Sequence, residues 1–175
     1  PEKAHEYTRY WAAKTFGQEF ADEYATIKRA YYRLAAAGKP EHVNMIPYTI
    51  EEMDARISEY EEWVRKSDAL KARIPAFLQD AYYQLMEYPL KAAFEQNRKI
   101  FRAYQSLELA KAGQKDKALE YASEARMSYR NIKDLTEYYN KTMAAGKWDG
   151  MMSYHPQDRP QFFMPDAATP THINN

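Results

Sequence analysis

The chain has 175 residues, with 25 basic and 25 acidic side chains that cancel and with no cysteine. Balanced charge without a Lys/Arg cluster offers no positive field for nucleic acid or an anionic membrane surface, and the lack of cysteine excludes disulfides and cysteine-based zinc sites. No apolar run is long enough for a membrane span, and the first residues lack the layout of a signal peptide. The length suits one domain with a sizeable core.

Two helices are predicted in the first quarter of the chain. Tyr7, Tyr10 and Trp11 share one face of a short helix, which Gly17 is expected to interrupt. A second apolar stripe then recurs at helical spacing and stops before Gly38. Its members are Phe20, Tyr24, Ile27, Tyr31 and Leu34. A short helix followed by a longer one is therefore expected.

A capping box marks the start of the next helix. After a loop at residues 38–48, Thr49 and Glu52 have the spacing at which each side chain accepts the backbone N–H of the other. Apolar residues then repeat every three or four positions at Ile50, Met53, Ile57, Tyr60 and Val64. This pattern predicts a long helix that reaches about Lys71.

The stretch from Ile74 to Gly113 is expected to form the central helix, around which the rest of the chain packs. Pro75 suits a first helical turn, and Gly113 can end a helix in a left-handed conformation. Pro89 removes one backbone hydrogen bond, and its ring presses against the carbonyl of Leu85. We therefore predict a kink between these two residues rather than a break.

A last long helix is predicted after Gly113, with Gly146 as its end. Its regularly spaced small and apolar residues are Ala118, Ala122, Ala125, Tyr129, Ile132, Thr136, Tyr139 and Met143. Beyond Gly146, four prolines oppose another long helix, while methionines and aromatic residues are too frequent for free disorder. We interpret residues 148–175 as an extended strap that lies on the bundle or leads toward a following domain.

The predicted fold class is therefore all-α. Residues 1–147 are expected to form an antiparallel bundle of four to five helices with a long Pro-kinked central helix. Residues 148–175 are expected to form the extended C-terminal strap, rich in proline, methionine and aromatic residues, that leads toward a following domain missing from the chain.

The polar residues form no recognisable catalytic or metal site. The four histidines lie near the termini or in predicted loops, without the i, i+4 spacing of metal ligands. Glu2 and His5 form one Glu-x-x-His motif, whereas a di-iron bundle needs two copies and two further glutamates. The acidic pairs lie on polar helix faces, and no Gly-rich phosphate loop is present. We therefore expect no metal, no cofactor and no catalytic residue in this chain.

Short motifs follow one another in a fixed order through the chain. They are Tyr88-Pro89, Tyr138-Tyr139, Gly146-Lys147-Trp148 and Met151-Met152. They lie within or near the segments YWAAKTFGQEFADEYATIKRAYYRLAAAGKPE, DAYYQLMEYPLKAAFEQ and LTEYYNKTMAAGKWDGMM. In this order they resemble the helical-bundle domain of the α-glucuronidases of glycoside hydrolase family 115, over about Tyr7 to Met164.

The resemblance implies a part of a larger enzyme. Family members remove glucuronic acid or 4-O-methyl-glucuronic acid side chains from xylan, using an α/β domain, a (β/α)₈ barrel with the catalytic carboxylates, this bundle and a β-sandwich. The chain would be the bundle alone, an expectation that its start without Met and its abrupt end support. Its implied role is that of an accessory structural domain, not catalytic alone.

The same resemblance implies the partners. They are the barrel and β-sandwich domains of the same polypeptide, a xylan-derived oligosaccharide, and a second copy of the parent in a homodimer. The implied location is secreted or periplasmic. No sequence feature assigns nucleic acid or a membrane as a partner.

Trp148, Met151, Met152 and Tyr154 are the candidate domain-docking or substrate-side contacts. The preferred interpretation makes Trp148, Met151 and Met152 core residues that fix the strap. The other interpretation makes them the surface on which a barrel domain rests, with an exposed apolar patch in the chain alone. Tyr154 lies where the sequence departs from the pattern of the family.

Two other functions stay open. A stand-alone carbohydrate-binding module would use the excess of tyrosine and tryptophan, and it needs a row of exposed rings. Tyr82, Tyr83 and Tyr88 are expected to pack with their hydroxyls at the rim, whereas an open groove lined by these three rings would favour sugar stacking. A tetratricopeptide-like interaction bundle is suggested by the run GQKDKALEYASEA, although only one copy exists. That alternative requires a superhelical arrangement.

Overall fold

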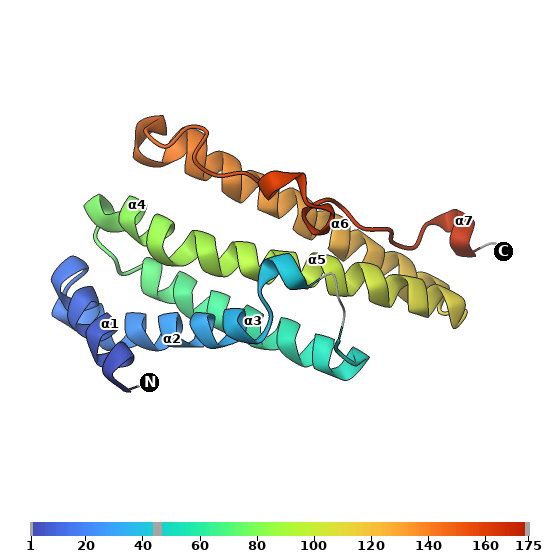
Figure 1. Ribbon diagram of the computed structural model, residues 1–175, viewed down its shortest axis with the longest axis horizontal. Helices are drawn as coiled ribbons and strands as arrows, with labels where there is room; N and C mark the ends of the chain where they lie inside the picture. Colours follow the sequence, from blue (N-terminus) through green and yellow to red (C-terminus); the bar gives the residue numbers. More distant parts are fainter. Residues whose placement is uncertain (1, 44–46, 174–175) are drawn as a thin grey trace.

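Each long helix of the chain runs antiparallel to its neighbour (Figure 1). The computed structural model describes residues 2–43 and 47–173, and this part of the chain contains no strand. The helices are α1 (Glu2–Thr15), α2 (Ala21–Ala37), α3 (Ile50–Lys71), α4 (Gln79–Tyr82), α5 (Tyr88–Lys111), α6 (Lys115–Glu137) and α7 (Pro170–Ile173). The predicted all-α bundle is confirmed.

Helix α5 lies at the centre of the bundle. It packs against α3 on one side and against α6 on the other, while α2 packs on α3 and α1 lies against α2 (Figure 1). The start of α3 is fixed by the predicted capping box: Glu52 donates its backbone N–H to the Thr49 hydroxyl, and Thr49 donates its N–H to the Glu52 carboxylate. Gly17, with φ 120°, separates α1 from the turn that precedes α2.

The central stretch is helical from Ala76 to Lys111, but it changes its hydrogen-bond pattern along the way. A 3₁₀ turn (Ala76–Leu78) leads into α4, and a π-helical turn (Tyr83–Glu87) joins α4 to α5. At the position of the predicted kink, the structure has a π-helical turn that ends two residues before Pro89. Such a turn relieves the clash between a proline ring and the preceding carbonyl.

The end of α6 differs from its prediction. Regular α-helix stops at Glu137, a π-helical turn covers Tyr138–Thr142, and Ala144 and Ala145 then adopt left-handed conformations before Gly146. The chain thus leaves the helix several residues before Gly146, which does have the expected positive φ of 77°. Tertiary contacts described below hold this turn, and they override the helical periodicity of the sequence.

The described residues form three sets of core residues, of which the third is the aromatic corner described in the next subsection. The larger core joins α1 to α5 and is rich in aromatic residues, including Tyr24, Tyr60, Tyr82 and Phe101. The second core consists of small residues on α5 and α6, against which Ala167 and Ala168 of the strap lie. Small side chains allow this close approach of the strap (Figure 1). None of the helices in the described ranges is long and apolar enough to cross a membrane.

Candidate functional site

An aromatic corner forms where α6 ends and the strap begins. Its buried members are Tyr83, Tyr88, Tyr139 and Met143, and Trp148 and Met152 pack against them. The rings of Tyr88 and Tyr139 lie 4.9 Å apart between centroids, at a tilted angle. The helical pattern of α6 brings Tyr139 to this point, and the π-helical turn before Pro89 presents the two tyrosines from the central stretch.

The backbone of the strap is clamped at the aromatic corner. Asn140 donates from Nδ2 to the carbonyl of Met152 at 2.8 Å, and its Oδ1 accepts the N–H of Met152 at 2.9 Å. Asp80 Oδ2 accepts the N–H of left-handed Ala144 at 3.0 Å. These three hydrogen bonds reverse the chain after α6 and set the direction in which the strap leaves.

The four predicted contact residues do not share one environment. Trp148 and Met152 are half-buried in the aromatic corner, whereas Met151 between them is 60% exposed. Tyr154 is half-buried and stacks edge-on against His155. Met152 and Tyr154 line one hollow of about 360 Å³ beneath the strap, and Trp148 and Met151 are absent from its described lining.

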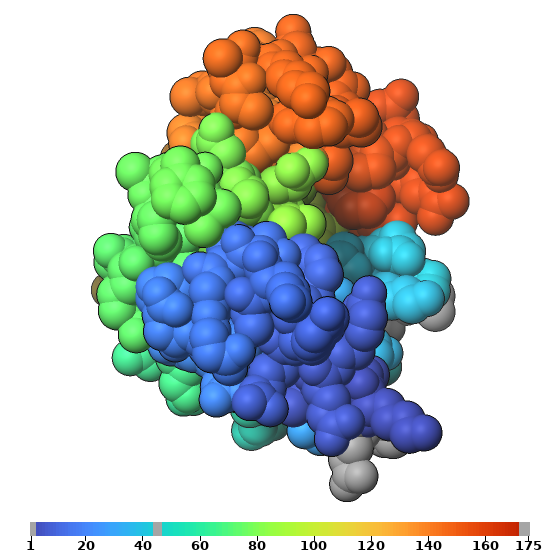
Figure 2. Space-filling model, turned by 90° about the vertical axis from the view of Figure 1, so that its left-hand side faces the viewer, coloured from blue at the N-terminus to red at the C-terminus, as the bar shows by residue number. Residues whose placement is uncertain are grey.

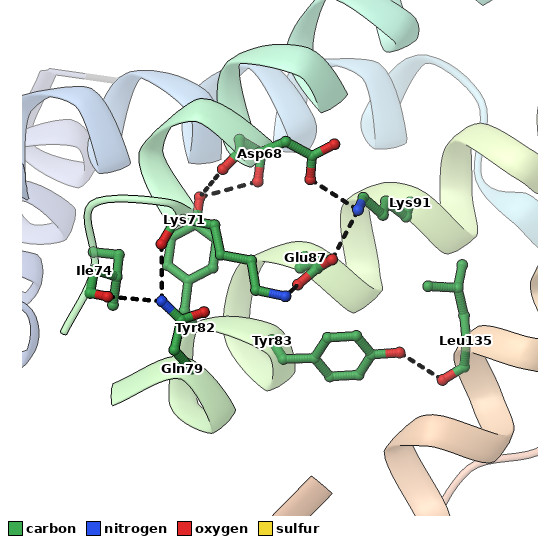
Figure 3. A network of polar contacts seen from close by, with 10 residues as sticks. Asp68, Lys71, Ile74, Gln79, Tyr82, Tyr83, Glu87, Lys91 and Leu135 are labelled. Carbon is green, nitrogen blue, oxygen red and sulfur yellow. Dashed lines mark hydrogen bonds and ion pairs between the residues drawn. The ribbon is translucent and has the colours of Figure 1, made fainter. Parts of the chain in front are cut away.

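A network of charges lies on the other side of the π-helical turn (Figure 3). Glu87 is 6% exposed, and its two carboxylate oxygens form ion pairs with Lys71 and Lys91. Lys91 also contacts Asp68 at 2.8 Å. Burial alone would lower the pKa of Lys91, but its hydrogen bonds to Asp68 and Glu87 outweigh this effect and raise it. The network joins α3 to the central stretch.

A hollow of about 520 Å³ borders this network, between α3, α5 and α6. Tyr83 lies at its wall and donates its hydroxyl to the carbonyl of Leu135 on α6 at 2.6 Å (Figure 3). Burial raises the pKa of Tyr83 above its usual range, so this hydroxyl keeps its proton. The hydroxyl therefore serves as a hydrogen-bond donor between helices.

Two of the three carboxylates that line this hollow are engaged in structural contacts, and the third, Asp134, is exposed on α6. Glu87 is held between two lysines, and Glu95 accepts hydrogen bonds from Arg98 and Asn131. A glycosidase needs one carboxylic acid and a second carboxylate facing a sugar, and neither residue is free for such a role. In the described ranges, no group of three or more His, Asp and Glu side chains could hold a metal.

The strap is fastened along its length by side chains of α5. Lys99 is fully buried, and its Nζ donates to the carbonyls of Gln161 at 3.1 Å and Phe162 at 3.0 Å. Gln96 donates to the same Gln161 carbonyl at 2.8 Å. Burial lowers the pKa of Lys99 to about 7. Ser106 accepts the N–H of Ala168 further along at 2.9 Å.

The tyrosines Tyr82, Tyr83 and Tyr88 are packed inside the protein. They are between 0% and 8% exposed, and their hydroxyls bond to internal partners rather than lying at a rim. These three rings therefore do not form the exposed row that a sugar-binding surface requires. The antiparallel arrangement of the helices likewise differs from the superhelix that a tetratricopeptide-like protein would show (Figure 1).

Several residues that hold distant segments of the main chain in place were not singled out by the sequence. Lys28, Asn140 and Lys99 each bond to main-chain groups of segments more than ten residues away. A lysine or asparagine in a helix gives no signal of such a partner. The only available signal was Pro89, which predicts that the carbonyl of Leu85 must find a donor outside its own helix.

Comparison with solved structures supports the resemblance that the short motifs suggested. No protein-family model and no curated protein matches the sequence. Among solved structures, the chain is similar to a family GH115 4-O-methyl-α-glucuronidase with specificity for decorated arabinogalactans, with a TM-score of 0.81 at 27% sequence identity. The match covers 94% of this chain. The resemblance to the helical bundle of a GH115 enzyme is confirmed.

The GH115-like bundle spans only 23% of the length of that enzyme. It therefore corresponds to one part of a much longer glycoside hydrolase.

Proposed function

We propose that this chain is an accessory helical domain of a multidomain glycoside hydrolase, and that it is not catalytic by itself. The parent enzyme would remove glucuronic acid or 4-O-methyl-glucuronic acid from a decorated polysaccharide such as xylan. The observation that carries this proposal is the structural match over nearly the whole chain to less than a quarter of a GH115 enzyme.

The polar chemistry of the chain supports a role without catalysis. The buried carboxylates Glu87 and Glu95 are used in ion pairs and hydrogen bonds that join helices. A catalytic pair would instead face an open sugar site with one raised pKa. The hydrolysis is therefore assigned to a barrel domain elsewhere in the parent polypeptide.

One end of the bundle supplies a surface for docking to another domain. Helix α1, the turn before α4 and the segment after α6 all lie at this end (Figures 1 and 2). These segments contribute exposed apolar side chains, with Phe77 84%, Tyr10 63% and Met151 60% exposed. A domain that rests on this end would bury these side chains. We assign this end to the contact with the barrel or β-sandwich domain.

The test compares the chain alone with its parent polypeptide. Residues 1–175 are expected to release no glucuronic acid from decorated xylan or arabinogalactan, whereas the parent releases it. In the parent, Met151→Asp is expected to weaken domain contact and lower the activity, because it places a charge in an apolar interface. Met127→Asp, at a 40% exposed methionine in the middle of α6, is the matched control. Hydrolysis by residues 1–175 alone would overturn the accessory role.

A further inference from the structure

Two neighbouring hollows lie between α1 and α2, away from the aromatic corner and the strap. The first has a volume of about 270 Å³, and the second about 320 Å³. Thr8 on α1 and Tyr32 on α2 line both. Each lies near the lower end of the size range of small-molecule sites, which is about 300–1,000 Å³.

The charges around these hollows are all positive among the described residues. The hollows are lined by the nitrogen-bearing side chains of His5, Lys28, Arg29 and Arg33. No carboxylate of a described residue lines either hollow. Arg33 forms an ion pair with Glu59 on α3. Lys28 and Arg29 form no ion pair with a carboxylate in the described part of the chain.

Several polar groups in the hollows lack partners. Lys28 uses one of its three N–H groups on the carbonyl of Leu85, and its other two have no acceptor in the described ranges. Tyr24 also lines the first hollow, and its hydroxyl forms no hydrogen bond to a described residue, although it is not among the fully buried unpartnered atoms of the described ranges. His5 lines the second hollow, and its buried Nδ1 is also without a described partner. Of these groups, Nδ1 of His5 is the buried atom without a described partner, and a bound ligand that pairs with it would recover free energy.

Aromatic rings form the walls of the first hollow. Tyr7 is 69% exposed and Tyr32 is 56% exposed, while Trp11 of α1 packs against the large core. Lys28 Nζ lies 5.3 Å from the centre of the Tyr32 ring. A ring of this kind offers an apolar face beside a polar edge, which suits the C–H face and the hydroxyls of a sugar.

We propose that the α1–α2 hollows form a binding site for a sugar that carries a carboxylate, with the carboxylate on Lys28 and the sugar ring against Tyr32 and Tyr7. This proposal does not rest on the accessory role described above. Burial lowers the pKa of Lys28 to about 8, and an anion placed beside it would raise this pKa and stabilise the ammonium form. The hydroxyl of Tyr24 and the ring of His5 supply further hydrogen bonds.

The first experiment is an NMR titration of the ¹⁵N-labelled chain with D-glucuronic acid, D-glucose and acetate. We expect glucuronic acid to shift the amides of α1 and α2 and to bind at least about tenfold more tightly than either other compound, because only it has both the carboxylate and the ring. Equal binding of acetate would reduce the site to an anion site and overturn the proposal. Absence of shifts, or shifts confined to another region, would also overturn it.

Two variants test the site, and only Tyr32→Ala separates binding from folding, because Lys28 also bonds to the carbonyl of Leu85. Tyr32→Ala removes an exposed ring and is expected to keep the fold while weakening glucuronic acid binding. Lys28→Met is expected to weaken it about ten- to a hundredfold, the effect of losing a hydrogen bond to a charged group. Lys66→Met is the control, because Lys66 also lies over an aromatic ring but is paired with Glu62. Unchanged binding in folded Tyr32→Ala would contradict the proposed site.

The binding site and the accessory role can fail separately. If the chain binds glucuronic acid but no barrel domain adjoins it, the site stands and the accessory role fails. If the parent is active and the titration shows no binding, the site fails and the accessory role stands.

Discussion

The ammonium of Lys28 on α2 donates a hydrogen bond to the main-chain oxygen of Leu85, four residues before Pro89. In a regular α-helix this carbonyl would accept the N–H of residue 89, which proline lacks. Lys28 supplies a donor from a neighbouring helix. The π-helical turn before Pro89 is thus held by a tertiary contact from α2.

Replacing Lys28 should destabilise the protein. Lys28→Met keeps most of the apolar stem but leaves the carbonyl of Leu85 without this donor, at an expected cost of about 1–3 kcal/mol in the free energy of unfolding. Urea unfolding measures the change. Lys66→Met, which removes an exposed i, i+4 ion pair with Glu62, should change it by less than about 0.5 kcal/mol. Equal effects of the two variants would show that the contact with Leu85 does not stabilise the π-helical turn.

The buried Lys99 should make stability depend on pH. Its pKa in the folded protein is about 7, below the ordinary value of 10.5, so between these values the unfolded chain binds a proton that the folded chain does not. The contribution of Lys99 to stability therefore rises as the pH increases from about 7 toward 10. Lys28, with a pKa of about 8, acts in the same direction.

The comparison that isolates Lys99 is the wild-type protein against Lys99→Met. Urea unfolding at about pH 7 and about pH 9.5 should show the free energy of the wild type rising relative to that of the variant. Measurements stop below pH 10, because the buried tyrosines such as Tyr83 have raised pKa values and oppose the trend above that pH. A constant difference between the two proteins would mean that Lys99 keeps its charge in the folded state.

Glu87 should be among the most sensitive charged positions. Glu87→Gln leaves Lys71 and Lys91 without their buried anion, at an expected cost of about 2–3 kcal/mol. This is below the cost for a fully buried pair, because both lysines are partly exposed. Thermal or urea unfolding tests it, with Glu62→Gln on the exposed surface of α3 as the matched control. A loss as small as that of the control would show that solvent replaces the network.

Asn140 should control the first part of the strap. Asn140→Ala removes both hydrogen bonds to the backbone of Met152, and we expect a loss of about 1–2 kcal/mol in unfolding free energy. Hydrogen exchange should increase at residues 148–155 while the amides of α5 stay protected. Lys141→Ala, at the exposed neighbouring position, is the control. Unchanged exchange in the strap would mean that packing of Trp148 and Met152 alone holds it.

The helices followed from the sequence because burial imposes a period of three to four residues. The apolar stripe on α2 and the capping box of α3 predicted the positions of these two helices correctly. Gly113 follows the end of α5 with a φ of 74°, as expected. The pattern on α6 also marks the buried residues through Met143. It overestimated the helix length, because a backbone can leave the helix while its side chains continue to pack.

The site was harder to predict, since its contacts are made to main-chain atoms. Lys99 bonds to the carbonyls of Gln161 and Phe162, and any residue could supply those carbonyls. Burial of Trp148 and Met152 against the aromatic corner was anticipated as one interpretation, but the exposure of Met151 between them depends on the clamp by Asn140. Such pairings depend on the folded path of the chain and carry no local sequence signal.

The most direct measurement of the central claim is the sequence of the reading frame on both sides of residues 1 and 175. The account predicts that the frame continues upstream into a (β/α)₈ barrel that carries candidate catalytic carboxylates, and downstream into β-strands. A frame bounded by an initiator methionine or signal peptide directly before residue 1 and by a stop codon after residue 175 would contradict it. The chain would then be a free-standing bundle.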